Sequence, residues 1–62
     1  MKYSEMHRKL RKAGCTVVKN GKRHPIWISP ITGLYFETSY HESEEVKRGT
    51  MHDIEIRSGI KL

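Results

Sequence analysis

One histidine stands among residues that could act on a phosphodiester. His24 directly follows Lys22 and Arg23 and lies three residues beyond Gly21. Imidazole ordinarily exchanges a proton between about pH 5 and 8, and Lys, Arg and turn amides bind phosphate oxygens. Such a histidine could take the proton of a ribose 2′-hydroxyl, which attacks the adjacent phosphate, while the cations stabilise the charge on its oxygens. The alternative is a polar residue at a strand end with no chemical role.

The remaining histidines and the one cysteine offer less chemistry. His41 is a candidate second acid or base on a polar loop, although its neighbours favour a structural role such as bonding a loop carbonyl. His7 and His52 lie among charged residues of expected helices, and we predict that both are solvated. Cys15 has no partner for a disulfide, and no histidine pair has metal-binding spacing. The sequence therefore predicts no metal and no small-molecule cofactor.

The overall charge indicates the class of partner. Twelve Lys and Arg against seven Asp and Glu give the 62 residues a formal net charge of +5. This balance favours RNA or DNA, bound through phosphate contacts, and a chain this short has little room for a deep pocket. The alternative is a basic surface that only confers solubility or that binds an acidic protein.

Membrane and export signals are not evident. The first residues lack the apolar core of a signal peptide, and no apolar run is long enough to span a bilayer. A single cysteine fits a reducing compartment. We therefore expect a soluble cytoplasmic protein.

The elements that must position these residues are predicted to form one domain, residues 1–62. Apolar periodicity and glycine, proline and asparagine signals predict the order α-β-β-β-α. The expected elements are a helix over Ser4–Ala13, strands over Cys15–Lys19, Pro25–Ser29 and Leu34–Ser39, and a helix from Thr50 to Gly59. We predict Ser4 and Thr50 as N-caps. The fold class is then α+β, a three-stranded antiparallel sheet with both helices on one face.

Strand alternation predicts which side chains face the helices. The residues assigned to that side are Ile26, Ile28, Leu34 and Phe36. Trp27 and Tyr35 then fall on the open face, where exposed aromatic side chains are typical of a partner surface. The same alternation would put His24 on the helix side unless Pro25 makes the backbone irregular.

A set of short motifs spreads over nearly the whole chain. They are Ser4-Glu5 and Gly14 around the first helix, Asn20 to His24, His41, Val46 to Met51, Ile54, and Ser58-Gly59-Ile60. In these motifs the chain resembles the HicA toxins of bacterial type II toxin–antitoxin systems, which are small basic ribonucleases with a double-stranded-RNA-binding-domain-like fold. The resemblance implies a metal-independent mRNA endonuclease, an mRNA interferase, whose catalytic histidine is His24 and which a HicB-type antitoxin neutralises.

The candidate site residues follow from the chemistry of the residues and from the family resemblance together. His24 is the candidate catalytic residue, Lys19, Lys22 and Arg23 are candidate RNA contacts, His41 and Gly21 are candidate supporting residues, and Trp27 and Tyr35 are a candidate antitoxin interface. We expect the antitoxin to cover His24 or the basic turn. A non-catalytic RNA-binding or protein-interaction module of the same fold is the alternative.

Overall fold

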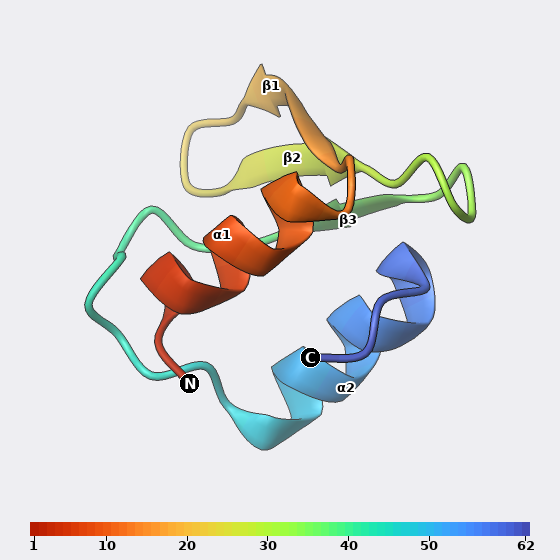
Figure 1. Ribbon diagram of the computed structural model, residues 1–62. Helices are drawn as coiled ribbons and strands as arrows, with labels where there is room; N and C mark the ends of the chain where they lie inside the picture. The colour runs from red at the N-terminus through yellow and green to blue at the C-terminus, as the bar shows by residue number, and fades with distance from the viewer.

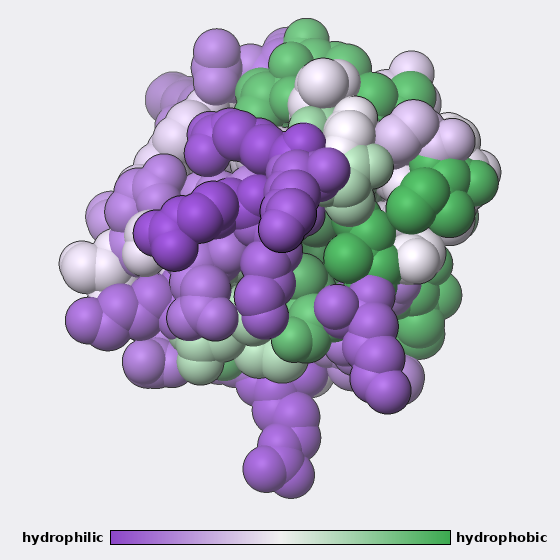
Figure 2. Space-filling model, viewed as in Figure 1, coloured by the Kyte–Doolittle hydropathy of each residue, from purple (hydrophilic) through white to green (hydrophobic).

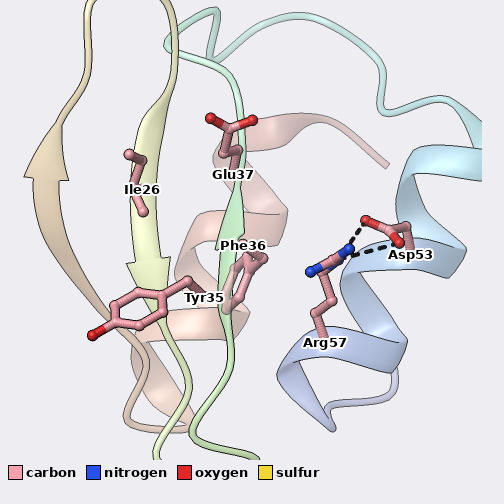
Figure 3. Close-up of a pocket in the computed structure, with 6 residues that line it drawn as sticks. All are labelled: Ile26, Tyr35, Phe36, Glu37, Asp53 and Arg57. Carbon is pink, nitrogen blue, oxygen red and sulfur yellow. Dashed lines mark hydrogen bonds and ion pairs between the residues drawn. The ribbon is translucent and has the colours of Figure 1, made fainter.

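Two helices and a three-stranded antiparallel sheet follow one another in the predicted order (Figure 1). The computed structural model describes all residues 1–62. The elements are α1 (Tyr3–Lys12), β1 (Thr16–Asn20), β2 (Pro25–Ile28), β3 (Tyr35–Glu37) and α2 (Arg48–Ser58). The sheet order is β1-β2-β3, so neighbouring strands in the chain are neighbours in space. Both helices lie on the same side of the sheet, with α2 beside the β3 edge (Figures 1 and 3).

The N-terminus of α1 is completed by a distant loop and not by a side chain. The prediction of Ser4 as N-cap is wrong, because the helix begins at Tyr3 after Lys2 and no side chain caps it. The amides of Tyr3 and Ser4 donate instead to the carbonyls of Glu44 and Glu42, at 3.0 and 2.9 Å. These bonds satisfy amides that a helix start otherwise leaves unpaired. They also hold the loop after β3 against α1.

The second helix starts earlier than predicted and ends where predicted. Thr50 is not its N-cap, because the helix begins at Arg48 after Lys47. Two residues before the helix, the amide of the buried Val46 donates to the Met1 carbonyl at 2.9 Å. Gly59 ends the helix with a φ of 73°, a conformation that favours glycine. The apolar residue that follows, Ile60, packs against the core.

The β1–β2 hairpin carries a four-residue loop. Asn20 pairs with Pro25, which begins β2 as predicted, so the loop runs from Gly21 to His24. A Cβ on Gly21 would lie 2.6 Å from the carbonyl oxygen of His24. The loop therefore closes onto Gly21 so tightly that any side chain there would displace the backbone of His24.

The core corrects the predicted facing of β2. Trp27 pairs with Phe36 across β2 and β3, and the two side chains are only 1% and 3% exposed. The prediction that Trp27 lies on the open face is therefore wrong. The larger aromatic ring takes the buried face, and its Nε1–H donates to Thr38 Oγ1 at 2.9 Å, so no polar group is left unpaired.

The open face carries the residues that alternate with Trp27. Ile26 and Ile28, predicted to face the helices, pair instead with Glu37 and Tyr35 on that face (Figure 3). Tyr35 is 58% exposed, as predicted, and Leu34, also predicted to face the helices, is 48% exposed because it lies in the turn before β3. His24 lies in the loop before β2 and is exposed, so the strand alternation does not extend to it.

The surface over α1 is hydrophilic. In Figure 2 polar side chains cover most of the face in view, and hydrophobic atoms gather toward the β2–β3 turn and α2. The buried apolar core lies beneath, between the inner face of the sheet and both helices. Its members are Tyr3, Met6, Leu10, Cys15, Trp27, Phe36, Val46 and Ile54.

Candidate functional site

Two loops at one end of the sheet form an open cleft of about 650 Å³, which we name the loop cleft. Lys22, Arg23 and His24 line it from the β1–β2 loop, and Tyr40 and His41 line it from the segment after β3. Tyr3, Ser39 and Glu44 complete the lining. The fold thus brings both exposed loop histidines and two cations to one hollow.

The cations of the loop cleft are free to meet an anion. Lys22 and Arg23 are exposed and take part in no ion pair. Burial, and to a lesser extent the nearby Glu44 carboxylate, raise the pKa of the Tyr3 hydroxyl, so this group stays protonated at neutral pH. The cleft therefore offers two positive charges and a hydroxyl donor beside its imidazoles.

Tyr40 joins the two loops. Its hydroxyl donates to the carbonyl oxygen of Gly21 at 2.7 Å, across 19 positions of the chain. The backbone amide of His41, the next residue, donates to Ser39 Oγ at 3.0 Å. The Tyr40 bond sets how the loop of His24 and the loop of His41 lie relative to each other, and the Ser39 bond shapes the turn that carries His41.

His7 is buried within a polar network, so the prediction that it is solvated is wrong. Its Nδ1 lies 3.1 Å from Glu42 Oε1 and its Nε2 lies 2.8 Å from Thr38 Oγ1. Because a carboxylate only accepts, Nδ1 carries the proton, and in the neutral ring Nε2 accepts from the Thr38 hydroxyl. The oxygen of Thr38 accepts in turn from Trp27. The network holds the segment that carries His41 at both of its ends.

The other predicted site residues lie elsewhere. Lys19 is exposed on β1, opposite Ile26, and does not line the loop cleft. Trp27 is buried, which removes it as an exposed interface residue. Tyr35 is exposed on the open face, and His52 is exposed on α2 as predicted.

Sequence reasoning missed the residues that support the cleft. Ser39 and Tyr40 directly precede His41 in the chain, and that adjacency was the only signal that could have pointed to them. His7 and Glu42 lie 35 positions apart, so no local pattern connects them.

A second hollow, of about 450 Å³, runs between β3 and α2 (Figure 3). It is lined by Tyr35 and Glu37 from the sheet and by Asp53 and Arg57 from the helix. The guanidinium of Arg57 is already engaged by Asp53, with Nε 3.2 Å from Oδ2. This groove contains no imidazole and no unpaired cation, so the loop cleft is the better candidate for phosphate chemistry.

Cys15 is not a nucleophile in this fold. It is 2% exposed, and burial raises the pKa of its thiol, opposed in part by a hydrogen bond with Ser29. We expect the thiol to stay unreactive toward a thiol-specific disulfide reagent at pH 7 and to react within seconds in denaturant. Rapid labelling of the native protein, measured by absorbance, would contradict this burial.

No three His, Cys, Asp or Glu side chains are arranged to hold a metal ion. Neither helix has the length and apolar character that crossing a membrane requires. Comparison with family models, curated proteins and solved structures found no match.

Proposed function

We propose that this protein is a metal-independent RNA endonuclease of the HicA type, acting in the loop cleft. One observation carries the proposal: His24 and His41, from loops that are distant in sequence, line the same cleft as Lys22 and Arg23. Cleavage of RNA through its own 2′-hydroxyl needs one group to accept a proton, one to donate a proton, and positive charge at the phosphate. The four side chains match these requirements.

In the proposed mechanism His24 accepts the proton of the ribose 2′-hydroxyl. The 2′-oxygen attacks the adjacent phosphorus, and the bond from phosphorus to the 5′-oxygen of the next nucleotide breaks. His41 donates a proton to that leaving oxygen, so the products are a 2′,3′-cyclic phosphate and a free 5′-hydroxyl. Lys22 and Arg23 stabilise the additional charge on the phosphoryl oxygens.

In this proposal the substrate is mRNA and the protein is a cytoplasmic toxin that a HicB-type antitoxin neutralises. The excess of positive charge supports a polyanionic substrate and an antitoxin with acidic residues facing Lys22 and Arg23. Tyr35, exposed at the edge strand, is the remaining aromatic candidate for that interface. An antitoxin complex with His24 fully open would point to inhibition by another route.

The direct test is incubation of purified protein with end-labelled RNA in the presence of a chelator. Discrete fragments ending in 2′,3′-cyclic phosphate would support the proposal. A shift in mobility without cleavage would favour the alternative, a non-catalytic RNA-binding module, which the same charges support. A preparation of the His24→Ala variant, purified in the same way, controls for contaminating nuclease.

Removing the hydroxyl of Tyr40 should slow cleavage without unfolding the protein. We expect Tyr40→Phe to lower the rate by about tenfold to hundredfold, because misplacing a catalytic group by about 1 Å can cost that much. The lost bond to the Gly21 carbonyl is exposed, so its cost in stability is only about 0.5–1.5 kcal/mol. Tyr35→Phe is the matched control, since Tyr35 is exposed and its hydroxyl makes no hydrogen bond. Equal cleavage rates for the two variants would show that Tyr40 does not position the loops.

Neutralising the cations of the cleft should weaken RNA binding in a salt-dependent way. We expect the double variant Lys22→Ala/Arg23→Ala to make the slope of log affinity against log salt shallower by about 1–2. Fluorescence anisotropy with labelled RNA at several salt concentrations measures this slope. Lys47→Ala/Lys61→Ala removes the same charge from exposed positions outside the cleft, and an equal change there would mean that binding depends only on net charge.

A further inference from the structure

A smaller hollow of about 200 Å³ adjoins the loop cleft on the side of α1, and we name it the inner recess. The two hollows share Ser39 and Tyr40, so Tyr40 forms part of the wall between them. A hollow of this size can take one planar base while the sugar and phosphate lie outside it. An RNA strand with a phosphate in the loop cleft has a base within reach of the inner recess.

We propose that the inner recess binds a guanine base of the RNA and gives the enzyme a preference for cleavage beside guanine. This inference rests on the proposed function, because the loop cleft must hold the RNA backbone. Polar side chains line much of the recess, and the apolar residues Val17, Pro25 and Trp27 line the remainder; the polar members are Arg11, Asn20, Ser39, Tyr40, Glu42 and the buried His7. Single-stranded RNA is commonly read in this manner, with one base turned out and bonded along its edge.

Glu42 presents the acceptor that selects guanine. Its Oε1 accepts the Nδ1–H of His7 at 3.1 Å, which fixes the direction of the carboxylate and leaves Oε2 without a partner in the protein. A carboxylate only accepts hydrogen bonds, and guanine offers two donors, N1–H and N2–H, along one edge. Adenine and cytosine have an unprotonated ring nitrogen at this edge, and uracil has a carbonyl on each side of its single N–H. Each of these bases therefore has only one donor position at this edge with an acceptor beside it, and none presents the two adjacent donors of guanine.

Arg11 presents the complementary donors. It is one helical turn beyond His7 on α1, and its guanidinium carbon lies 5.4 Å from the ring centre of Trp27. Arg11 takes part in no ion pair, so its N–H groups are available. Arginine commonly donates to O6 and N7 of guanine, the edge next to N1–H. Arg11 and Glu42 thus line one recess with opposite hydrogen-bonding character and do not pair with each other.

Tyr40 connects recognition with cleavage. Tyr40 is 43% exposed and lines both hollows, where its ring can stack on a base that enters the recess. Its hydroxyl holds the carbonyl of Gly21, at the start of the loop that carries His24. A base stacked on Tyr40 would therefore place its own ribose beside the proposed proton acceptor.

The test is titration of the protein with the 3′-monophosphates of guanosine, adenosine, cytidine and uridine, followed by NMR shifts of backbone amides. We expect guanosine 3′-monophosphate to bind about tenfold more tightly than the others, the discrimination of one good base contact. The largest shifts should include the amides of Asn20, Tyr40 and Glu42. Glu42→Gln should remove most of the preference.

Two further variants keep the result interpretable. Arg11→Gln should also reduce the preference for guanosine, while the contact between Glu42 and His7 stays intact. Glu37→Gln is the control: it removes an exposed carboxylate outside the recess and should leave the preference unchanged. Any of three results would overturn the proposal: equal affinity for the four nucleotides, no measurable binding of the guanosine nucleotide, or a preference for guanosine that survives both recess variants. Nucleotide binding does not require cleavage. A protein that prefers guanosine but does not cleave RNA would therefore overturn the proposed enzyme activity, while the proposal that the recess binds guanine would hold.

Discussion

Replacing His24 by alanine is expected to lower the rate of RNA cleavage by about 10²- to 10⁴-fold, the usual contribution of a positioned proton-transfer group. The side chain is exposed and makes no hydrogen bond within the protein, so its removal should leave the fold intact. Binding of RNA should persist, because Lys22 and Arg23 remain in the cleft. The variant should therefore lose chemistry while keeping affinity.

Single-turnover cleavage of end-labelled RNA measures this effect, with circular dichroism to verify the fold. His52→Ala is the matched control, because His52 is an exposed histidine on α2, outside the cleft. The two-histidine mechanism also predicts that His41→Ala slows cleavage, because the leaving oxygen then lacks its proton donor. A His24→Ala variant as active as the wild type would rule out the mechanism.

Replacing Trp27 by alanine is expected to destabilise the fold by about 3–5 kcal/mol, the usual cost of emptying a large aromatic site. Trp27 is 1% exposed, its ring lies 6.2 Å from that of Phe36 and 5.3 Å from that of His7, and it donates to Thr38. Small domains are stable by only about 5–15 kcal/mol, so this loss would remove a large part of the stability of the fold.

Thermal denaturation followed by circular dichroism measures the loss, which should lower Tm by more than about 12 °C in a domain of this size. Trp27→Phe keeps one aromatic ring but removes the N–H donor and the second ring, so it should cost less than Trp27→Ala. Tyr35→Ala, on the exposed face of the sheet, should change Tm by only a few degrees. A Trp27→Ala variant that melts with the wild type would contradict the burial of this ring.

The sequence predicted elements well where one residue type determines the local backbone. Gly14 and Gly59 take positive φ at the helix ends and Pro25 begins β2, because each is suited to that backbone position. The facing of β2 was wrong because Ile26, Trp27 and Ile28 are all apolar, so alternation gives two equivalent solutions. Only the pairing with β3 decides between them, and that pairing is a tertiary property.

The candidate site was predictable only in its local half. Lys22, Arg23 and His24 are consecutive, so their proximity needs no folding information. His41 joins them because β2 and β3 run antiparallel, which brings the residues before β2 next to those after β3. The polar network of His7 could not be predicted, because its partners Thr38 and Glu42 are 31 and 35 positions away. For the same reason, the burial of His7 could not be recognised from α1, in which most of its neighbours are charged.

The bonds that complete the start of α1 also provide a reporter for hydrogen exchange. The first amides of a helix usually exchange rapidly, because they have no partner within the helix. Here the amides of Tyr3 and Ser4 are held by the carbonyls of Glu44 and Glu42, so they exchange only when that loop leaves the helix. Their exchange rates therefore measure how often the segment carrying His41 opens, and RNA bound in the cleft should slow both amides together.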